Sequence, residues 1–215
     1  QYAALGAFGL IAAVHLVACA SRNLLLLRRI TKCLLMPLLA LCYILIARTV
    51  SPLVVAAILS GFVGDVVLLF RPHRWAFPAG IIAFAAGHAF YIASFLRAVL
   101  QMPQWYVFAL FGVFTLACAV SLLRFLWKGI PVRLRPPGFL YMLVIGSMAS
   151  SALIFAFSGV SPIGWLAAVG GILFVASDTT LAVDAFHRPV HHRNIIVMST
   201  YILAQTLLVS ALALV

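Results

Sequence analysis

Acidic residues are almost absent from this chain. Its 215 residues include only three Asp and Glu against 14 Lys and Arg, and charged residues make up 8% of the sequence. A soluble domain carries roughly 25% charged residues. Apolar residues reach 66%, and the mean hydropathy is +1.23. A composition so poor in charge excludes an ordinary soluble domain and indicates an integral membrane protein.

The sequence also lacks the short motifs of several enzyme classes. No G-x-S-x-G, H-E-x-x-H or phosphate-binding glycine loop occurs, so serine-hydrolase, zinc-protease and nucleotide chemistry have no residues to perform them. No C-x-x-C pair occurs, and the four cysteines are scattered through apolar segments at Cys19, Cys33, Cys42 and Cys118. We interpret them as small core residues rather than a disulfide framework or a metal site.

Long apolar runs dominate the sequence, and eight of them approach the roughly 20 residues that a helix needs to cross about 30 Å of hydrocarbon. Because backbone groups in lipid must be hydrogen-bonded internally and no alternating barrel pattern occurs, the predicted spans are helices. The predicted fold class is all-α, a polytopic membrane protein in which residues 1–215 form a single eight-helix transmembrane domain. The longest linker, 127–138, is too short to fold alone. The predicted spans are 2–20, 31–47, 52–70, 77–97, 104–126, 138–157, 163–186 and 194–214.

The basic residues predict how the chain crosses the membrane. The linkers after the first, third, fifth and seventh spans carry 12 of the 14 Lys and Arg, and the other linkers carry only Arg48 and Arg97. By the positive-inside rule, the basic linkers face the cytoplasm and both termini lie on the non-cytoplasmic side. This placement indicates membrane lipids as partners of the positive charge, not nucleic acid. If the protein is bacterial, we expect it in the inner membrane.

The sequence allows two further interpretations, one of the first span and one of the arrangement of all eight spans. The first span has a competing interpretation as a secretory signal, since 18–20 resembles a cleavage site, although no basic region precedes it. The third and seventh spans share a small residue, an aspartate and a leucine three positions later, at 64–68 and 177–181. This similarity is compatible with a parallel repeat of four plus four helices.

Two of the three acids lie inside predicted spans. Asp65 and Asp178 both fall in the cytoplasmic half of their helices. A carboxylate at the bilayer centre costs at least about 2.5 kcal/mol, so such residues usually face the bundle interior and mark a site. The alternative is that each merely locks two helices together through a cation or a hydroxyl. Asp184, four residues before Arg188, is predicted to form a structural surface pair.

Other polar residues follow helical stripes. Two such stripes, on the fourth and eighth spans, are Phe84, His88 and Tyr91, and Met198, Tyr201 and Gln205. They either bond neighbouring helices or orient a substrate. Lys32, expected to open the second span, is either an interfacial anchor or a contact for a phosphate.

The stretch from 187 to 193 contains His187, His191 and His192 together with two arginines. A metal site is one interpretation. An interfacial turn rich in Arg and His more commonly faces lipid headgroups, and only Asp184 lies nearby. We therefore predict no metal and no cofactor.

Five blocks lie in order from the second span to the eighth: "TKCLLMPLLAL" (31–41), "SGFVGDVVLLF" (60–70), "FAAGHAFYI" (84–92), "FVASDTTLAVDAF" (174–186) and "MSTYILAQ" (198–205). Together these blocks resemble the YhhN-like lysoplasmalogenases, polytopic enzymes that hydrolyse the vinyl ether of lysoplasmalogens to a fatty aldehyde and a glycerophospho-base. The resemblance implies an eight-helix membrane hydrolase in which Asp65 and Asp178 are essential, and it aligns Lys32 with a lysine of the second helix. Cys33 departs from the proline that often follows that lysine.

Two aspartates suit this chemistry. A vinyl ether opens when an acid protonates its β-carbon, which leaves an oxocarbenium ion for water to capture. Burial and a second carboxylate keep one carboxyl group neutral, while an ionised partner stabilises the cation and deprotonates water. We predict Asp178 as the acid and Asp65 as the base. The expected substrate-binding and orienting residues are Lys32, Arg71, Arg74, His88, Tyr91, Ser177, Tyr201 and Gln205.

Competing functions use the same residues. A transporter or flippase would use Asp65 and Asp178 to relay protons or bind a cation. A related enzyme would cleave another lipid bond, such as an ester or an amide. A purely structural membrane protein would need neither acid. The substrate headgroup and the oligomeric state leave no signal in the sequence.

Overall fold

A computed structural model describes residues 1–21, 23–70, 73, 75–99, 103–158 and 162–214 of the chain. Within these ranges all regular structure is helical, and eight helices are long and apolar enough to cross a membrane. The all-α, eight-span prediction is therefore confirmed. The elements are α1 (Tyr2–Ala20), α2 (Leu25–Ile46), α3 (Pro52–Val67), η1 (Leu68–Phe70), α4 (Ala76–Ala98), α5 (Trp105–Leu126), η2 (Val132–Leu134), α6 (Arg135–Phe157), α7 (Gly164–Phe186) and α8 (Arg193–Ala213).

The predicted start of the second span was wrong by two turns of helix. α2 begins at Leu25 rather than at residue 31. Leucine and arginine are good helix formers, and Arg28 and Arg29 can extend their charged ends out of the apolar region while their stems stay in it. Lys32 therefore lies about 10 Å inside the helix instead of at its first turn. This displacement brings its side chain to the level of the site described below.

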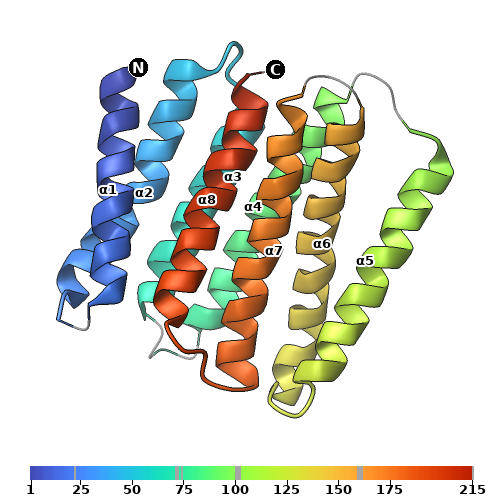
Figure 1. Cartoon of the computed structure of the whole chain (residues 1–215). Helices are drawn as coiled ribbons and strands as arrows, with labels where there is room; N and C mark the ends of the chain where they lie inside the picture. Colours follow the sequence, from blue (N-terminus) through green and yellow to red (C-terminus); the bar gives the residue numbers. More distant parts are fainter. Residues whose placement is uncertain (22, 71–72, 74, 100–102, 159–161, 215) are drawn as a thin grey trace.

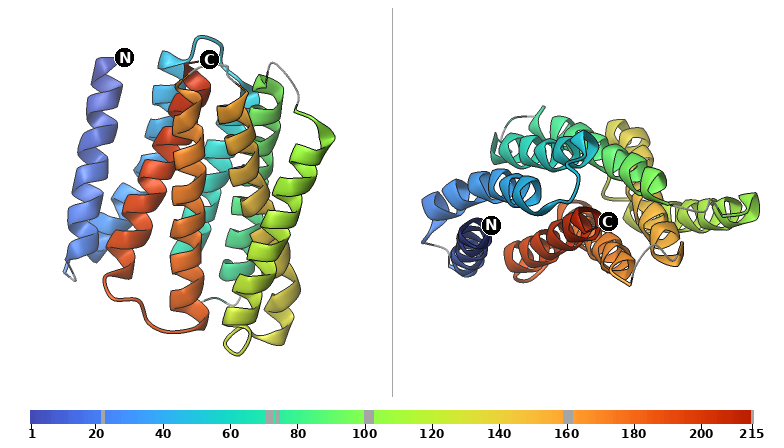
Figure 2. Two further views of the ribbon diagram at one scale, coloured as in Figure 1. Left: turned by 45° about the vertical axis from the view of Figure 1, so that its right-hand side comes forward. Right: turned by 90° about the horizontal axis from the view of Figure 1, so that it is seen from above.

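Seven helices form a closed ring in the order α1, α2, α3, α4, α6, α7 and α8, with α8 returning to α1. The view along the bundle shows α5 outside this ring, at the edge opposite α1 and α2, where it packs mainly on α6 (Figure 2). Both termini lie at the same end of the bundle (Figure 1). An even number of spans requires this, whichever side of the membrane that end faces.

Small residues let the helices that carry the two aspartates pack closely. A Cβ built on Gly87 of α4 would lie 3.1 Å from the carbonyl oxygen of Ala57 on α3. A Cβ built on Gly170 of α7 would lie 3.0 Å from the carbonyl oxygen of Ala204 on α8. Close backbone approach is the usual means by which membrane helices gain packing energy, because lipid offers them no hydrophobic driving force.

Candidate active site

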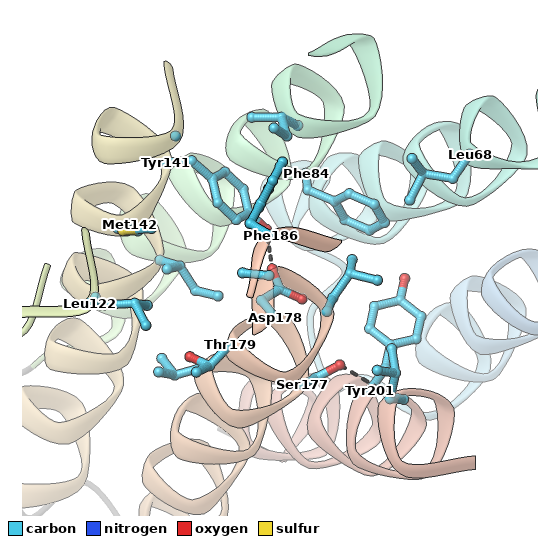
Figure 3. Close-up of a pocket in the computed structure, with 18 of the residues that line it drawn as sticks. Leu68, Phe84, Leu122, Tyr141, Met142, Ser177, Asp178, Thr179, Phe186 and Tyr201 are labelled. Atoms are coloured by element: carbon cyan, nitrogen blue, oxygen red, sulfur yellow. Dashed lines mark hydrogen bonds between the residues drawn. The ribbon is translucent and has the colours of Figure 1, made fainter. Parts of the chain in front are cut away.

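A cavity of about 930 Å³ lies within the bundle, and all eight helices contribute to its wall. Asp65 near the end of α3 and Asp178 on α7 both line it. The two intramembrane acids thus face one space. Figure 3 shows Asp178 between Leu122 and Met142 on one side and Tyr201 on the other.

Asp65 is buried, with 4% of its surface exposed, and forms an ion pair. The Nζ atom of Lys32 lies 3.1 Å from its Oδ1 atom, which ties α2 to α3. The Oδ2 atom has no hydrogen-bond partner among the described residues. Lys32 is therefore neither a free interfacial anchor nor an unoccupied phosphate ligand: its charge already meets a carboxylate.

Asp178 is half-buried and has a different environment. The hydroxyl group of Tyr141 on α6 donates a hydrogen bond to its Oδ2 atom (Figure 3). Asp178 forms no ion pair with any described residue. The two carboxyl groups thus differ in their partners, since a cation meets one and a neutral donor meets the other.

The remaining predicted residues fall into two groups. Ser177 and Tyr201 line the cavity, and Ser177 donates from Oγ to the carbonyl oxygen of Val197 at 3.1 Å. The Tyr201 hydroxyl lies near Asp65 but forms no hydrogen bond of normal geometry with any described residue. Arg71 and Arg74 lie outside the residues that the structure describes.

The second group lies behind the cavity wall. Tyr91 donates a 2.6 Å hydrogen bond to Oε1 of Gln205, which joins α4 to α8. His88 is buried, and its Nε2 atom lies 3.3 Å from the Tyr141 hydroxyl. His88 therefore reaches Asp178 only through Tyr141. These three predicted residues are placed to support the wall rather than to contact a ligand.

Tyr141 was missed by the sequence analysis. It lies six residues after the start of α6, at the same end of the bundle as Asp178, which lies eight residues before the end of α7. A tyrosine at that depth in a span was the available signal. The arginines Arg28 and Arg29 also line the cavity, because α2 begins early.

The predicted partner of Asp184 was wrong. Its Oδ2 atom lies 2.6 Å from Nη1 of Arg193 instead of pairing with Arg188, and its Oδ1 atom accepts a 3.1 Å bond from the amide of Val190. The chain turns after α7, so the first residue of α8 reaches Asp184.

Within the described ranges, no group of three His, Cys, Asp or Glu is placed to hold a metal ion.

The chain is similar in sequence to one known family and to several curated proteins. A sequence model of the YhhN family matches residues 27–212. Lysoplasmalogenase TMEM86B of Sus scrofa is 32% identical over 153 residues, which are 71% of this chain and 59% of that protein. Lysoplasmalogenase TMEM86B of Mus musculus is 30% identical over 175 residues, 79% of this chain and 70% of that protein.

A third relative, lysoplasmalogenase TMEM86A of Bos taurus, is 27% identical over 153 residues, 68% of this chain and 59% of that protein. The chain thus spans about 59% of the length of the pig and cattle proteins. No solved structure matches it.

Proposed function

The chain belongs to the YhhN family, and from that membership we propose that it is a lysoplasmalogenase. It hydrolyses the vinyl ether bond of a lysoplasmalogen to a fatty aldehyde and a glycerophospho-base. The observation that carries this proposal is that Asp65 and Asp178, two of only three acids in the chain, line one cavity large enough for a lipid. The curated relatives supply the type of bond.

Asp178 is the proton donor in this mechanism. It has no cationic partner among the described residues, and a carboxyl group in an apolar setting without such a partner keeps its proton. The Tyr141 hydroxyl occupies its Oδ2 atom, so Oδ1 carries the proton that is transferred to the β-carbon of the vinyl ether. The slow step of the reaction thus has a dedicated acid.

Asp65 is the base. The Lys32 ammonium at 3.1 Å stabilises its charged form. The carboxylate stabilises the oxocarbenium ion and then takes a proton from the water that adds to the α-carbon. The resulting hemiacetal breaks its bond to the glycerol oxygen, which gains a proton as the aldehyde forms. Two carboxyl groups divide the work in the same way in glycoside hydrolysis, where the transition state is also oxocarbenium-like.

The cavity wall holds this pair in place. Tyr141, supported by His88, fixes the orientation of Asp178. Tyr201, on α8, carries a hydroxyl without a hydrogen-bond partner among the described residues, and this hydroxyl is placed to orient water beside Asp65. A buried polar atom without a protein partner is what a bound water or substrate oxygen would satisfy.

We also propose that the cavity faces the cytoplasmic leaflet, with both termini on the other side, because the basic linkers follow the odd-numbered helices. Single cysteines introduced at 128 and at 104 of a cysteine-free variant would test this. Labelling of 128 from the outside of intact cells would contradict it.

The function is tested with purified protein in detergent, by following aldehyde release from lysoplasmalogen and from its saturated ether analogue. We expect release from the vinyl ether alone. Release of a fatty acid from an ester or amide lipid instead would identify a hydrolase of another bond. Proton-coupled flux in liposomes without hydrolysis would identify a transporter.

A further inference from the structure

The two ends of the cavity differ in charge. At the edge of the bundle formed by α1 and α2, its wall includes Arg28 and Arg29, which lie one turn before Lys32 on the same face of α2. At the opposite edge its wall is formed by α5, α6 and α7 and is largely apolar. Figures 1 and 2 show these edges on opposite sides of the bundle.

The two arginines at the cationic end have no acidic partner among the described residues. Neither Arg28 nor Arg29 forms an ion pair with any described residue, and Lys32 is occupied by Asp65. Arg193 also lines the cavity, but Asp184 compensates its charge at 2.6 Å. Two adjacent guanidinium groups in the wall of a cavity are suited to bind a phosphate.

The apolar end is a groove along the helices. Its α5 wall runs from Phe114 to Phe125 and its α6 wall from Met142 to Leu153, about 16 Å on each helix at 1.5 Å per residue. Phe114 is 63% exposed and Ile172 of α7 is 57% exposed, although both line the cavity. The groove is therefore open sideways toward the lipid between α5 and α7.

The aspartates lie between these ends. Lys32 and Asp65 adjoin the cationic end, while Asp178 lies beside Leu122 and Met142 at the mouth of the groove (Figure 3). We propose that the cavity binds a single-chain phospholipid in one orientation, with its phosphate on Arg28 and Arg29 and its hydrocarbon chain in the groove between α5, α6 and α7.

This orientation agrees with the structure of a lysoplasmalogen, whose identity as the substrate rests on the proposed function. Its vinyl ether joins the glycerol, which carries the phosphate a few bonds away, to the hydrocarbon chain. The reacting carbons are thus the junction between the charged and apolar parts of the molecule. In the reverse orientation the chain would displace water from two arginines and leave the phosphate among Phe and Leu side chains.

Leu153 marks the deep end of the groove, where the end of the bound chain would lie. It lies 12 residues after Tyr141 on α6, about 18 Å along the helix axis toward the end of the bundle that holds the termini. Near it, the hydroxyl groups of Thr115 and Ser150 are hydrogen-bonded at 3.0 Å and hold α5 against α6. A larger side chain at residue 153 would fill the deep end without contacting either aspartate.

Photo-crosslinking tests the orientation independently of catalysis. The probe is a saturated ether lysophosphatidylcholine with a diazirine at the end of its chain, which the proposed reaction does not consume. We expect crosslinks to peptides containing 114–122 and 145–153. Crosslinks confined to peptides from α1 and α2 would overturn the proposal, and so would labelling that an excess of unlabelled lysophospholipid does not suppress.

Variants test both ends with matched controls. Leu153→Trp should shift the preference toward shorter chains by about tenfold in relative kcat/KM, whereas Leu140→Trp, at a residue 62% exposed on the same helix, should not. Arg28→Gln with Arg29→Gln should raise KM or the Kd of the probe about tenfold, and Arg133→Gln should leave both unchanged.

The outcomes separate this proposal from the proposed function. If no vinyl ether is cleaved but the crosslinks and the Kd shift appear as expected, the binding orientation stands and the reaction is wrong. If the vinyl ether is cleaved, but Leu153→Trp leaves the chain preference unchanged and no crosslinks form in 114–122 or 145–153, the orientation is wrong and the reaction stands.

Discussion

Lys32→Met tests the ion pair that distinguishes the two aspartates. The Lys32 Nζ and Asp65 Oδ1 atoms are 3.1 Å apart, and only 18% and 5% of the two side chains are exposed. At that separation and an effective dielectric constant near 20, two unit charges attract by about 5 kcal/mol. Removing one partner of a buried pair typically costs about 3–5 kcal/mol, because the other charge stays buried without compensation.

We therefore expect Lys32→Met to lower the free energy of unfolding by about 3–5 kcal/mol. The double variant Lys32→Met with Asp65→Asn removes both charges and should recover most of that loss. Neither variant should have the parental activity, since Asp65 has lost the cation that stabilises its charged form in one and is absent in the other. Lys128→Met, at an exposed lysine, is the control and should leave stability unchanged.

The assay is heat- and denaturant-induced unfolding in one detergent, followed by size-exclusion chromatography and tryptophan fluorescence, with aldehyde release measured on the folded fraction. A Lys32→Met protein as stable as the parent would refute the buried-pair argument. So would a double variant no more stable than Lys32→Met alone. Full activity of the double variant would refute the assignment of Asp65 as the base.

Further predictions concern the hydrogen bonds around the site. Tyr141→Phe should reduce kcat by about 10- to 100-fold while the protein stays folded, because Asp178 loses the donor that orients it. An unchanged kcat would show that other groups orient the Asp178 carboxyl group. Tyr91→Phe should destabilise the protein by about 1–3 kcal/mol, because it leaves Oε1 of Gln205 buried without its 2.6 Å donor, and should change KM little. An unfolding midpoint equal to that of the parent would contradict this.

Much of the fold follows from the sequence for a simple physical reason. Apolar runs of span length have one stable arrangement in lipid, so their number and approximate bounds were predictable. The cost of burying a carboxylate likewise identified Asp65 and Asp178 as residues that face the interior. Their similar depth allowed a shared site, but the cavity that both line comes from the arrangement of the helices.

The partners of these residues were not predictable in the same way. Lys32 reaches Asp65 because α2 begins at Leu25, and a helix start among leucines and arginines leaves no sharp signal. Tyr141 bonds Asp178 because α6, not α5, closes the ring between α4 and α7. Neighbour relations among helices depend on packing that hydropathy does not encode.

The position of α5 illustrates the same limit. Its sequence reads as an ordinary span, yet it lies outside the ring and forms one wall of the apolar groove. Phe114 and Phe125 are exposed there, as residues facing lipid would be. Nothing in their spacing distinguishes a groove wall from a lipid-facing surface, so only the arrangement of helices reveals it.

The central claim is that Asp65 and Asp178 act together on a vinyl ether. Its most direct test is the rate of aldehyde release from lysoplasmalogen by the parent protein, Asp65→Asn and Asp178→Asn, each confirmed folded, beside the saturated ether analogue. We predict release by the parent from the vinyl ether alone and a loss of at least about 100-fold in each variant. Turnover near the parental rate in either folded variant, or equal release from the saturated analogue, would contradict the account.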